Sequence, residues 1–186
     1  EINGAKLSDR VLLVKGGDLT EANEYKEGLF SIQSEESCAI ADFADAKSTE
    51  LVIDLCAAPG GKAAAMAEQM LKSSTSTEPL TKTEPGIADG KIIALELYEH
   101  RAALIEATAR RLGLENIEVR CQNAVEQIDA LVGKADLVLA DVPCSGLGVI
   151  RRKPEMKYRD EFDFDELVEI QKCILETGSS YLKPGG

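Results

Sequence analysis

Residues 51–62 read Leu-Val-Ile-Asp-Leu-Cys-Ala-Ala-Pro-Gly-Gly-Lys, an apolar run that passes directly into a glycine-rich turn. A short apolar run bounded by glycine is typical of a buried strand, and the residues that follow, 62–72, favour a helix. A strand that enters a glycine-rich turn and then a helix is where α/β proteins bind nucleotide-like ligands. This stretch therefore predicts both the fold class and the place of a ligand.

The residues of the turn indicate which ligand it can bind. A phosphate-binding P-loop requires Gly-x-x-x-x-Gly-Lys-Ser/Thr, but Cys56 stands at the first glycine and Ala63 replaces the hydroxyl that would hold magnesium. The dinucleotide pattern Gly-x-Gly-x-x-Gly also fails. A turn without a phosphate cradle suits a nucleoside without phosphates, such as S-adenosylmethionine. The expected cofactor contacts are Cys56, Ala57, Ala58, Pro59, Gly60, Gly61 and Lys62.

The composition fits one globular α/β domain, with 186 residues, 44% of them hydrophobic and 29% charged. The five cysteines are odd in number and form no Cys-x-x-Cys pair, which argues against a disulfide framework or structural zinc and favours a reducing cytoplasm. No apolar run approaches the roughly 18 residues of a membrane span. The net charge of −12 argues against broad attraction to nucleic acid but allows a local basic patch. We expect a cytoplasmic protein with neither metal nor membrane partner.

From residue 51 onward, expected strands alternate with expected helices, which predicts a mainly parallel sheet with right-handed crossovers. The strands are 51–55, 92–95, 117–120 and a buried strand at 136–140, and the helices are 34–46, 62–72, 99–112, 125–131 and 166–182. Two extended pieces, 11–14 and 29–32, precede them. The polar residues 73–89 predict a mobile surface insertion. The chain thus divides into an N-terminal extension, 1–33, and a main domain, 34–186.

Polar residues follow the second and third expected strands, at the edge of the sheet where ligands bind. Glu96 is a candidate for the ribose hydroxyls, and without residues 73–89 it follows Lys62 by 17 positions, close to the spacing of about 20 that this role requires. The alternative is a solvated glutamate at a strand end. Asn123 offers a donor and an acceptor to the adenine edge. A simple turn asparagine is the alternative there.

The second informative stretch, Asp141-Val-Pro-Cys144, follows the fourth expected strand. It brings a carboxylate and a thiol to the same edge of the sheet as the glycine turn. An exposed thiol there can serve covalent chemistry, although free cysteines are more often buried. Arg151, Arg152 and Lys153 follow as a basic cluster placed to hold RNA phosphates. Such clusters usually only solvate a surface.

These motifs resemble those of the bacterial Sun/RsmB-type and eukaryotic NOL1/NOP2/Sun-type RNA cytosine-C5 methyltransferases. The resemblance rests mainly on residues 54–62 and 141–155 and covers 28–186. It implies a Rossmann-like class I S-adenosylmethionine-dependent methyltransferase fold, S-adenosylmethionine as cofactor, and RNA as partner, with ribosomal RNA favoured over transfer RNA. Residues 1–33 would then be the end of an RNA-binding subdomain.

The resemblance also implies roles for single residues. In this family a cysteine of a Thr-Cys motif adds to C6 of cytosine, so that C5 can attack the sulfonium methyl group. The Pro-Cys cysteine, here Cys144, assists product release, and Lys62 helps to position cofactor or substrate. Asp141 contacts the base and is also expected among the cofactor-binding residues. Asn123 stands where the family usually has Asp. The Thr-Cys motif normally follows just after Gly186, so we expect the nucleophile and the C-terminal strands to be missing from this chain.

Two other hypotheses stay open at this point. Cys144 could itself be the nucleophile, as in DNA cytosine methyltransferases whose Pro-Cys motif attacks C6, although the continuation Arg-Arg-Lys-Pro-Glu at 151–155 argues against it. Alternatively, the polypeptide could be a truncated, non-catalytic module that binds the cofactor or RNA without turnover.

Overall fold

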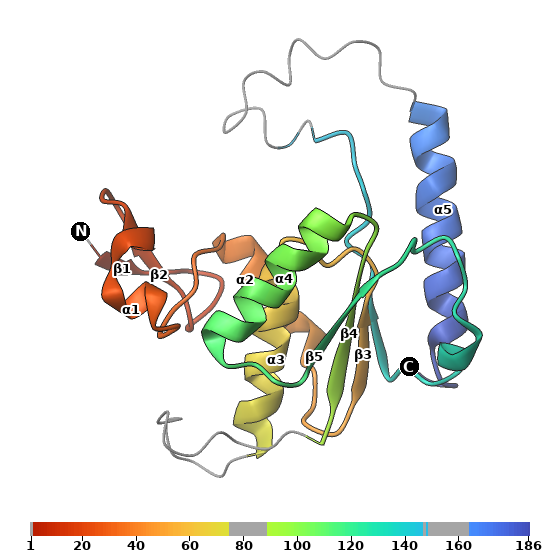
Figure 1. Ribbon diagram of the computed structural model, residues 1–186, viewed down its shortest axis with the longest axis horizontal. Coiled ribbons are helices and arrows are strands. Elements are labelled where there is room, and N and C mark those ends of the chain that lie inside the picture. The colour runs from red at the N-terminus through yellow and green to blue at the C-terminus, as the bar shows by residue number, and fades with distance from the viewer. Residues whose placement is uncertain (1, 75–88, 147, 149–163) are drawn as a thin grey trace.

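The computed structural model describes residues 2–74, 89–146, 148 and 164–186. It contains a four-stranded parallel sheet between helices and a two-stranded antiparallel hairpin at the N-terminal end (Figure 1). The elements are, in chain order, β1 (Ile2–Gly4), β2 (Leu12–Val14), η1 (Leu19–Glu21), α1 (Asn23–Lys26), α2 (Glu35–Ala44), β3 (Leu51–Asp54), α3 (Gly61–Ser74), β4 (Lys91–Glu96), α4 (Glu99–Leu112), β5 (Ile117–Cys121), η2 (Asp129–Leu131), β6 (Leu137–Leu139) and α5 (Phe164–Tyr181).

The strands of the main sheet follow the order β5-β4-β3-β6, and every neighbouring pair is parallel. Asp54 at the end of β3 pairs with both Ala94 and Leu139, and Glu96 at the end of β4 pairs with Cys121. The carboxyl ends of the strands therefore meet at one edge. This confirms the mainly parallel sheet predicted from the alternation of strands and helices.

The core has two layers because side chains of a strand alternate between its two faces. Val52 and Ile92 pack with α2 and α3 on one face, while Ile53 and Ile93 pack with Ile174 and Tyr181 of α5 on the other. Figure 1 shows α2, α3 and α4 on one side of the sheet and α5 on the opposite side. Burial of each such side chain contributes roughly 1.5–3 kcal/mol.

The fourth strand differs from the prediction of a buried strand at 136–140. β6 spans only Leu137–Leu139, and all three residues are half-buried. Among the described residues β6 pairs along its length with β3 alone, and the chain after α5 adds one parallel bridge, between Ala135 and Leu182. Burial of a strand depends on neighbours on both sides, which an apolar run does not reveal.

Three further local predictions need correction. Residues 29–32 lie in the described part of the chain and form no strand, and the helix expected at 125–131 is reduced to the short η2. α3 continues to Ser74 and so includes the first two residues of the insertion predicted at 73–89. Residues 75–88 of that insertion lie outside the described residues.

The N-terminal hairpin is tied to α2 by polar contacts. Arg10 forms an ion pair with Asp42, and Ser8 donates to the same carboxylate at 2.6 Å. The division into 1–33 and 34–186 stays a prediction. No helix within the described ranges is both long and apolar enough to cross a membrane.

Candidate cofactor and active site

The turn between β3 and α3 folds back on the sheet edge and on α4. Ala57 donates its backbone N–H to Leu95 at 2.9 Å, and Gly60 donates to Ala57 at 2.7 Å. Gly60 has φ +103°, and a Cβ built on it would lie 3.1 Å from Cα of Ile105. Both the backbone conformation and the close approach of α4 require glycine here. The structure confirms the predicted sequence of strand, turn and helix.

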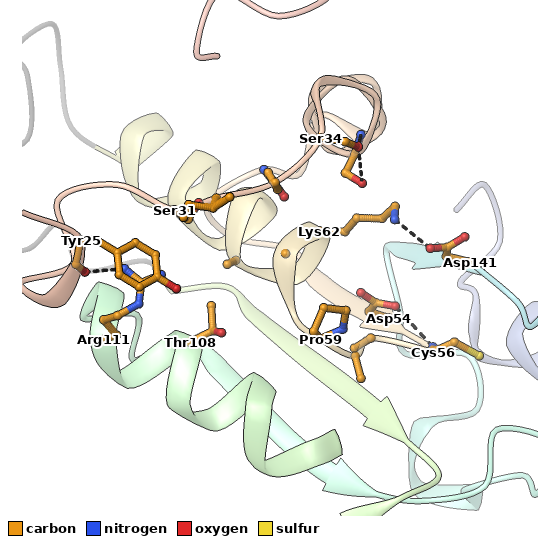
Figure 2. A pocket seen from close by; sticks show the side chains of 17 residues that line it. Tyr25, Ser31, Ser34, Asp54, Cys56, Pro59, Lys62, Thr108, Arg111 and Asp141 are labelled. Carbon is orange, nitrogen blue, oxygen red and sulfur yellow. Dashed lines mark hydrogen bonds and ion pairs between the residues drawn. The ribbon is translucent and has the colours of Figure 1, made fainter. Parts of the chain in front are cut away.

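Lys62 and Asp141, both predicted site residues, form an ion pair. Lys62 Nζ lies 2.8 Å from Asp141 Oδ2, with Lys62 in the first turn of α3 and Asp141 in the loop after β6 (Figure 2). The Lys62 side chain is 19% exposed and that of Asp141 56%. The pair therefore stands at the border between the protein and solvent, where a ligand can reach it.

Asp54 is a site residue that sequence reasoning missed. It ends β3 fully buried, its Oδ1 accepts from Cys56 N at 3.4 Å, and burial raises the pKa of its carboxyl to about 7, against the nearby positive charge of Lys62. The signal was available, since an acidic residue at the end of an otherwise apolar strand needs a reason. Burial also raises the pKa of the neighbouring Cys56 thiol to about 12, so this thiol stays protonated.

Glu96 is buried rather than solvated, which removes the alternative of a glutamate exposed at a strand end. It is 3% exposed, accepts from Tyr98 N at 3.1 Å, and pairs with Arg101 Nη1 at 3.2 Å. Arg101 also donates to the carbonyl of Ala58 at 3.3 Å, which links Glu96 to the glycine turn. Nothing in the local sequence pattern pointed to Arg101. The role of Glu96 toward a ribose stays a prediction.

Asn123 closes a turn after β5. Its Oδ1 accepts from the backbone N–H of Val125 at 3.2 Å, as asparagine commonly does in turns. An amide oxygen has two lone pairs, so this bond leaves the Asn123 amide able both to accept and to donate. The adenine contact expected for Asn123 stays a prediction.

The loop after β6 presents Cys144 to solvent. Cys144 is an exposed, free thiol, and the preceding carbonyl, of Pro143, accepts from Gln171 Nε2 at 2.7 Å. Gln171 lies on α5, so this helix holds the loop in place. The basic cluster Arg151, Arg152 and Lys153 falls outside the described residues.

A cavity of about 410 Å³ opens beside the turn (Figure 2). The predicted site residues in its lining are Cys56, Ala57, Ala58, Pro59, Gly61, Lys62 and Asp141. Gly60, Glu96, Asn123 and Cys144 are not among the lining residues. The rest of the lining comes from Asp54 and Ala64 and from two segments that sequence reasoning had not placed in the site, residues 25–37 and α4, through Thr108 and Arg111.

The cavity is lined by two acidic groups, Asp54 and Asp141, and by two cations, Lys62 and Arg111, of which Arg111 donates to the backbone of residues 25 and 30. Asp54, Asp141 and Lys62 can pair with both charges of an amino acid, as the methionine moiety of S-adenosylmethionine requires. In the described part of the chain, no group of three or more His, Cys, Asp or Glu side chains is arranged to hold a metal ion.

A parallel sheet between helices, with a cavity at the glycine turn after β3, gives the chain the Rossmann-like fold of the S-adenosylmethionine-dependent methyltransferases. Its family follows from comparison with known proteins. The chain belongs to the 16S rRNA methyltransferase RsmB/F family, whose sequence model matches residues 42–186.

Individual relatives agree with this membership. The chain is 38% identical over 185 residues to a probable ribosomal RNA small subunit methyltransferase B of Bacillus subtilis (strain 168), covering 98% of this chain and 38% of the relative. It matches the crystal structure of PH0851 with a TM-score of 0.86 and 28% identity, over 100% of this chain and 39% of that chain. NSun6 from Pyrococcus horikoshii, solved with the S-adenosylmethionine analogue SFG, matches with a TM-score of 0.74 and 25% identity, over 92% and 40%.

The chain therefore spans about two fifths of the length of each of these three proteins.

Proposed function

We propose that this chain carries the cofactor-binding part of an enzyme that methylates C5 of cytosine in RNA, with S-adenosylmethionine as methyl donor. The observation that carries the proposal is the ion pair between Lys62 and Asp141. Both residues line the cavity beside the glycine turn, and Asp141 lies three residues before the exposed Cys144. When bound, the cofactor supplies an electrophilic methyl group. The protein must hold it, orient the cytosine and manage protons.

The residues around the turn fit the cofactor. The backbone of the turn can approach the nucleoside and carries no phosphate-binding groups. Lys62 can bind the methionine carboxylate, and Asp54 can bind the ammonium group. Glu96 would take the ribose hydroxyls and Asn123 the adenine edge, each from the carboxyl end of its own strand. Glu96 is buried and fixed by Arg101, which supports a positioned acceptor rather than a mobile surface charge.

Gln33 provides an independent test of this fit. Gln33 lines the cavity, and its Oε1 is buried and has no hydrogen-bond partner among the described residues. A Cβ built on Gly61 would lie 2.8 Å from this oxygen, so only glycine leaves the amide in place. An unsatisfied acceptor beside Lys62 and Asp54 suits a ligand that brings a donor, as an amino-acid moiety does.

The proposed chemistry divides between two cysteines. A thiolate would add to C6 of cytosine, and C5 would take the methyl group as the sulfonium leaves as a neutral thioether. A base would then accept the C5 proton while the C6–S bond breaks and releases the thiolate. By resemblance to the family, the nucleophile belongs to a Thr-Cys motif, whereas Cys144 assists release. Asp141 contacts the base, and Lys62 keeps this carboxylate oriented through their ion pair.

The substrate is inferred from the relatives and the compartment from the cysteines. Relatives named ribosomal RNA small subunit methyltransferase B favour ribosomal over transfer RNA. Arg151, Arg152 and Lys153 would contact its phosphates. All five cysteines are free thiols, which supports a reducing cytoplasm.

A covalent trap separates the proposal from its alternatives. RNA containing 5-fluorocytidine cannot lose a proton from C5, so the C6–S adduct persists. Residues 1–186 contain no Thr-Cys pair, and we expect them to bind S-adenosylmethionine but to form neither adduct nor methylated RNA. An adduct that disappears in Cys144→Ala would instead make Cys144 the nucleophile. Methyl transfer by residues 1–186 with no dependence on Cys144 would contradict the assignment of roles to both cysteines.

A further inference from the structure

Arg111, near the end of α4, is bonded to a segment more than 80 residues earlier in the chain. Its Nη1 donates to the backbone carbonyls of Tyr25, at 2.8 Å, and Phe30, at 2.9 Å. The guanidinium carbon also lies 3.9 Å from the centroid of the Tyr25 ring. Arginine suits this place because one planar group can stack on a ring and donate at its edge. Figure 2 shows Arg111 and Tyr25 together at one end of the cavity.

Gly28 fixes the same segment from the backbone side. It has φ +74°, and a Cβ built on it would fall 1.8 Å from the carbonyl oxygen of Arg111. Any other residue at position 28 would push the segment away from the end of α4. Two separate features, the Arg111 side chain and the missing side chain of Gly28, thus hold residues 25–30 against α4.

The segment held in this way continues into the wall of the cavity. Ser31, Ile32, Gln33 and Ser34 line the same cavity as the residues of the glycine turn. Gln33 lies on Gly61 and also donates to Sγ of Cys38, which is 7% exposed. Residues 31–34 have no strand partner among the described residues, so no sheet hydrogen bonds hold them. Their position depends on the bond from Arg111 to Phe30 before them and on the contacts of Gln33 with Gly61 and Cys38.

We propose that Arg111 is a positioning residue for the cofactor site, which holds residues 25–34 as the outer wall of the cavity and keeps Gln33 on the glycine turn. The inference rests on the proposed function, because it assigns the wall to the S-adenosylmethionine site. Arg111 acts through Gln33 and Ser34, which lie nearer to the glycine turn.

The test compares matched pairs of variants of residues 1–186. Arg111→Ala removes the anchor, and Arg110→Ala, an exposed neighbour on the same turn of α4, is its control. Gly28→Ala displaces the segment while Arg111 keeps its charge. Its control is Gly16→Ala, where φ is +84° but nothing lies within 4 Å of the added Cβ. Because Gly28→Ala retains the guanidinium, it separates loss of the wall from loss of a direct contact with the ligand.

Two measurements read the result at a temperature well below unfolding. Calorimetry gives the dissociation constant for S-adenosylmethionine, and mass spectrometry gives the rate of Cys38 alkylation relative to the exposed Cys173. We expect Arg111→Ala and Gly28→Ala to weaken binding at least about tenfold and to expose Cys38, with both controls within about twofold of wild type. Hydrogen exchange at the backbone amides of Val52 and Ile53, which are fully buried in β3, serves as the marker of global opening.

Each other outcome overturns the proposal. Protection of Cys38 in Arg111→Ala would mean that Arg111 does not hold the wall. Reactive Cys38 with unchanged affinity would mean that the wall is no part of the cofactor site. Cys38 labelling that rises in parallel with hydrogen exchange at Val52 and Ile53 would reduce Arg111 to a general stabilising residue. Failure of the wild-type chain to bind S-adenosylmethionine would overturn the proposed function instead, while the Cys38 rates would still decide whether Arg111 anchors the segment.

Discussion

Lys62 Nζ lies 2.8 Å from Asp141 Oδ2, an ion pair that joins the first turn of α3 to the loop after β6. The two residues are 79 positions apart in sequence, and each follows a different strand of the parallel sheet. The pair closes one end of the cavity between the glycine turn and the Asp-Val-Pro-Cys loop. With the roles proposed for these two residues, binding of the cofactor and contact with the base would be coupled through this one ion pair.

Replacement of Lys62 tests this coupling. We expect Lys62→Met to raise the dissociation constant for S-adenosylmethionine at least about tenfold, or about 1.4 kcal/mol, because the methionine carboxylate loses its counter-charge. Thermal stability should change little, since partly exposed ion pairs contribute about 0–1 kcal/mol. Lys91→Met is the control, because Lys91 also pairs with an acid, Glu118, but lies at the start of β4. Equal effects of both variants on binding would contradict a specific role of Lys62.

Asp54 predicts a pH dependence of stability. The pKa of its carboxyl is about 7 in the folded protein, against an ordinary value of 3.8, because burial disfavours the charged form. The folded state therefore holds the proton more tightly than the unfolded chain. The free energy of unfolding should fall as pH rises from about 4 to about 7, by at most about 1.4 kcal/mol per pH unit, and level off above.

Urea unfolding of wild type and Asp54→Asn between pH 4.5 and 8 checks this slope, which the variant should lose. Asp136→Asn is the control, because hydrogen bonds from Lys183 and from Leu51 N lower the pKa of the Asp136 carboxyl. Asp136 is therefore ionised in both states across this range, and its replacement should keep the wild-type slope. A slope unchanged in Asp54→Asn would show that Asp54 does not titrate in this window.

Replacement of Gly60 by alanine, the smallest side chain, should lower the stability of the fold considerably. Gly60→Ala must adopt φ +103° and bring its Cβ to 3.1 Å from Ile105, so we expect a loss of roughly 1–3 kcal/mol of stability and weaker cofactor binding. Gly133→Ala shares the positive φ, at +63°, but has nothing within 4 Å and should cost less. Chemical denaturation measures the difference. A Gly133→Ala loss as large as that of Gly60→Ala would assign the effect to φ alone.

The hydrogen bond from Gln171 to Pro143 predicts an effect on the alkylation rate of Cys144. Loss of the hydrogen bond to Pro143 in Gln171→Leu should loosen the loop after β6 and change the alkylation rate of Cys144 several-fold, with the rate at Cys121 unchanged. Gln127→Leu removes a similar amide bond, to Asp129, away from the site and is the matched control. An unaltered Cys144 rate would show that the loop keeps its place without α5.

The local pattern of the sequence was sufficient for the four strands of the parallel sheet, for the glycine turn and for the sheet edge at which Lys62 and Asp141 meet. Apolar runs and glycines act over a few residues, and the parallel order brings Lys62 and Asp141 to one edge without further information. The contacts of Arg111 with Tyr25 and of Arg101 with Glu96 and Ala58 are set by packing between elements. No local periodicity encodes such contacts.

The half-burial of β6 was not predicted for the same reason, because the burial of a strand depends on the elements that pair beside it.

Calorimetric titration of residues 1–186 with S-adenosylmethionine, with ATP as the comparison ligand, tests the central claim most directly. The glycine turn has Cys56 and Ala63 where a P-loop has glycine and a hydroxyl. We predict saturable one-to-one binding of S-adenosylmethionine that Lys62→Met weakens, and no binding of ATP under the same conditions. Binding of ATP with equal affinity, or no binding of S-adenosylmethionine at high protein concentration, would contradict the account.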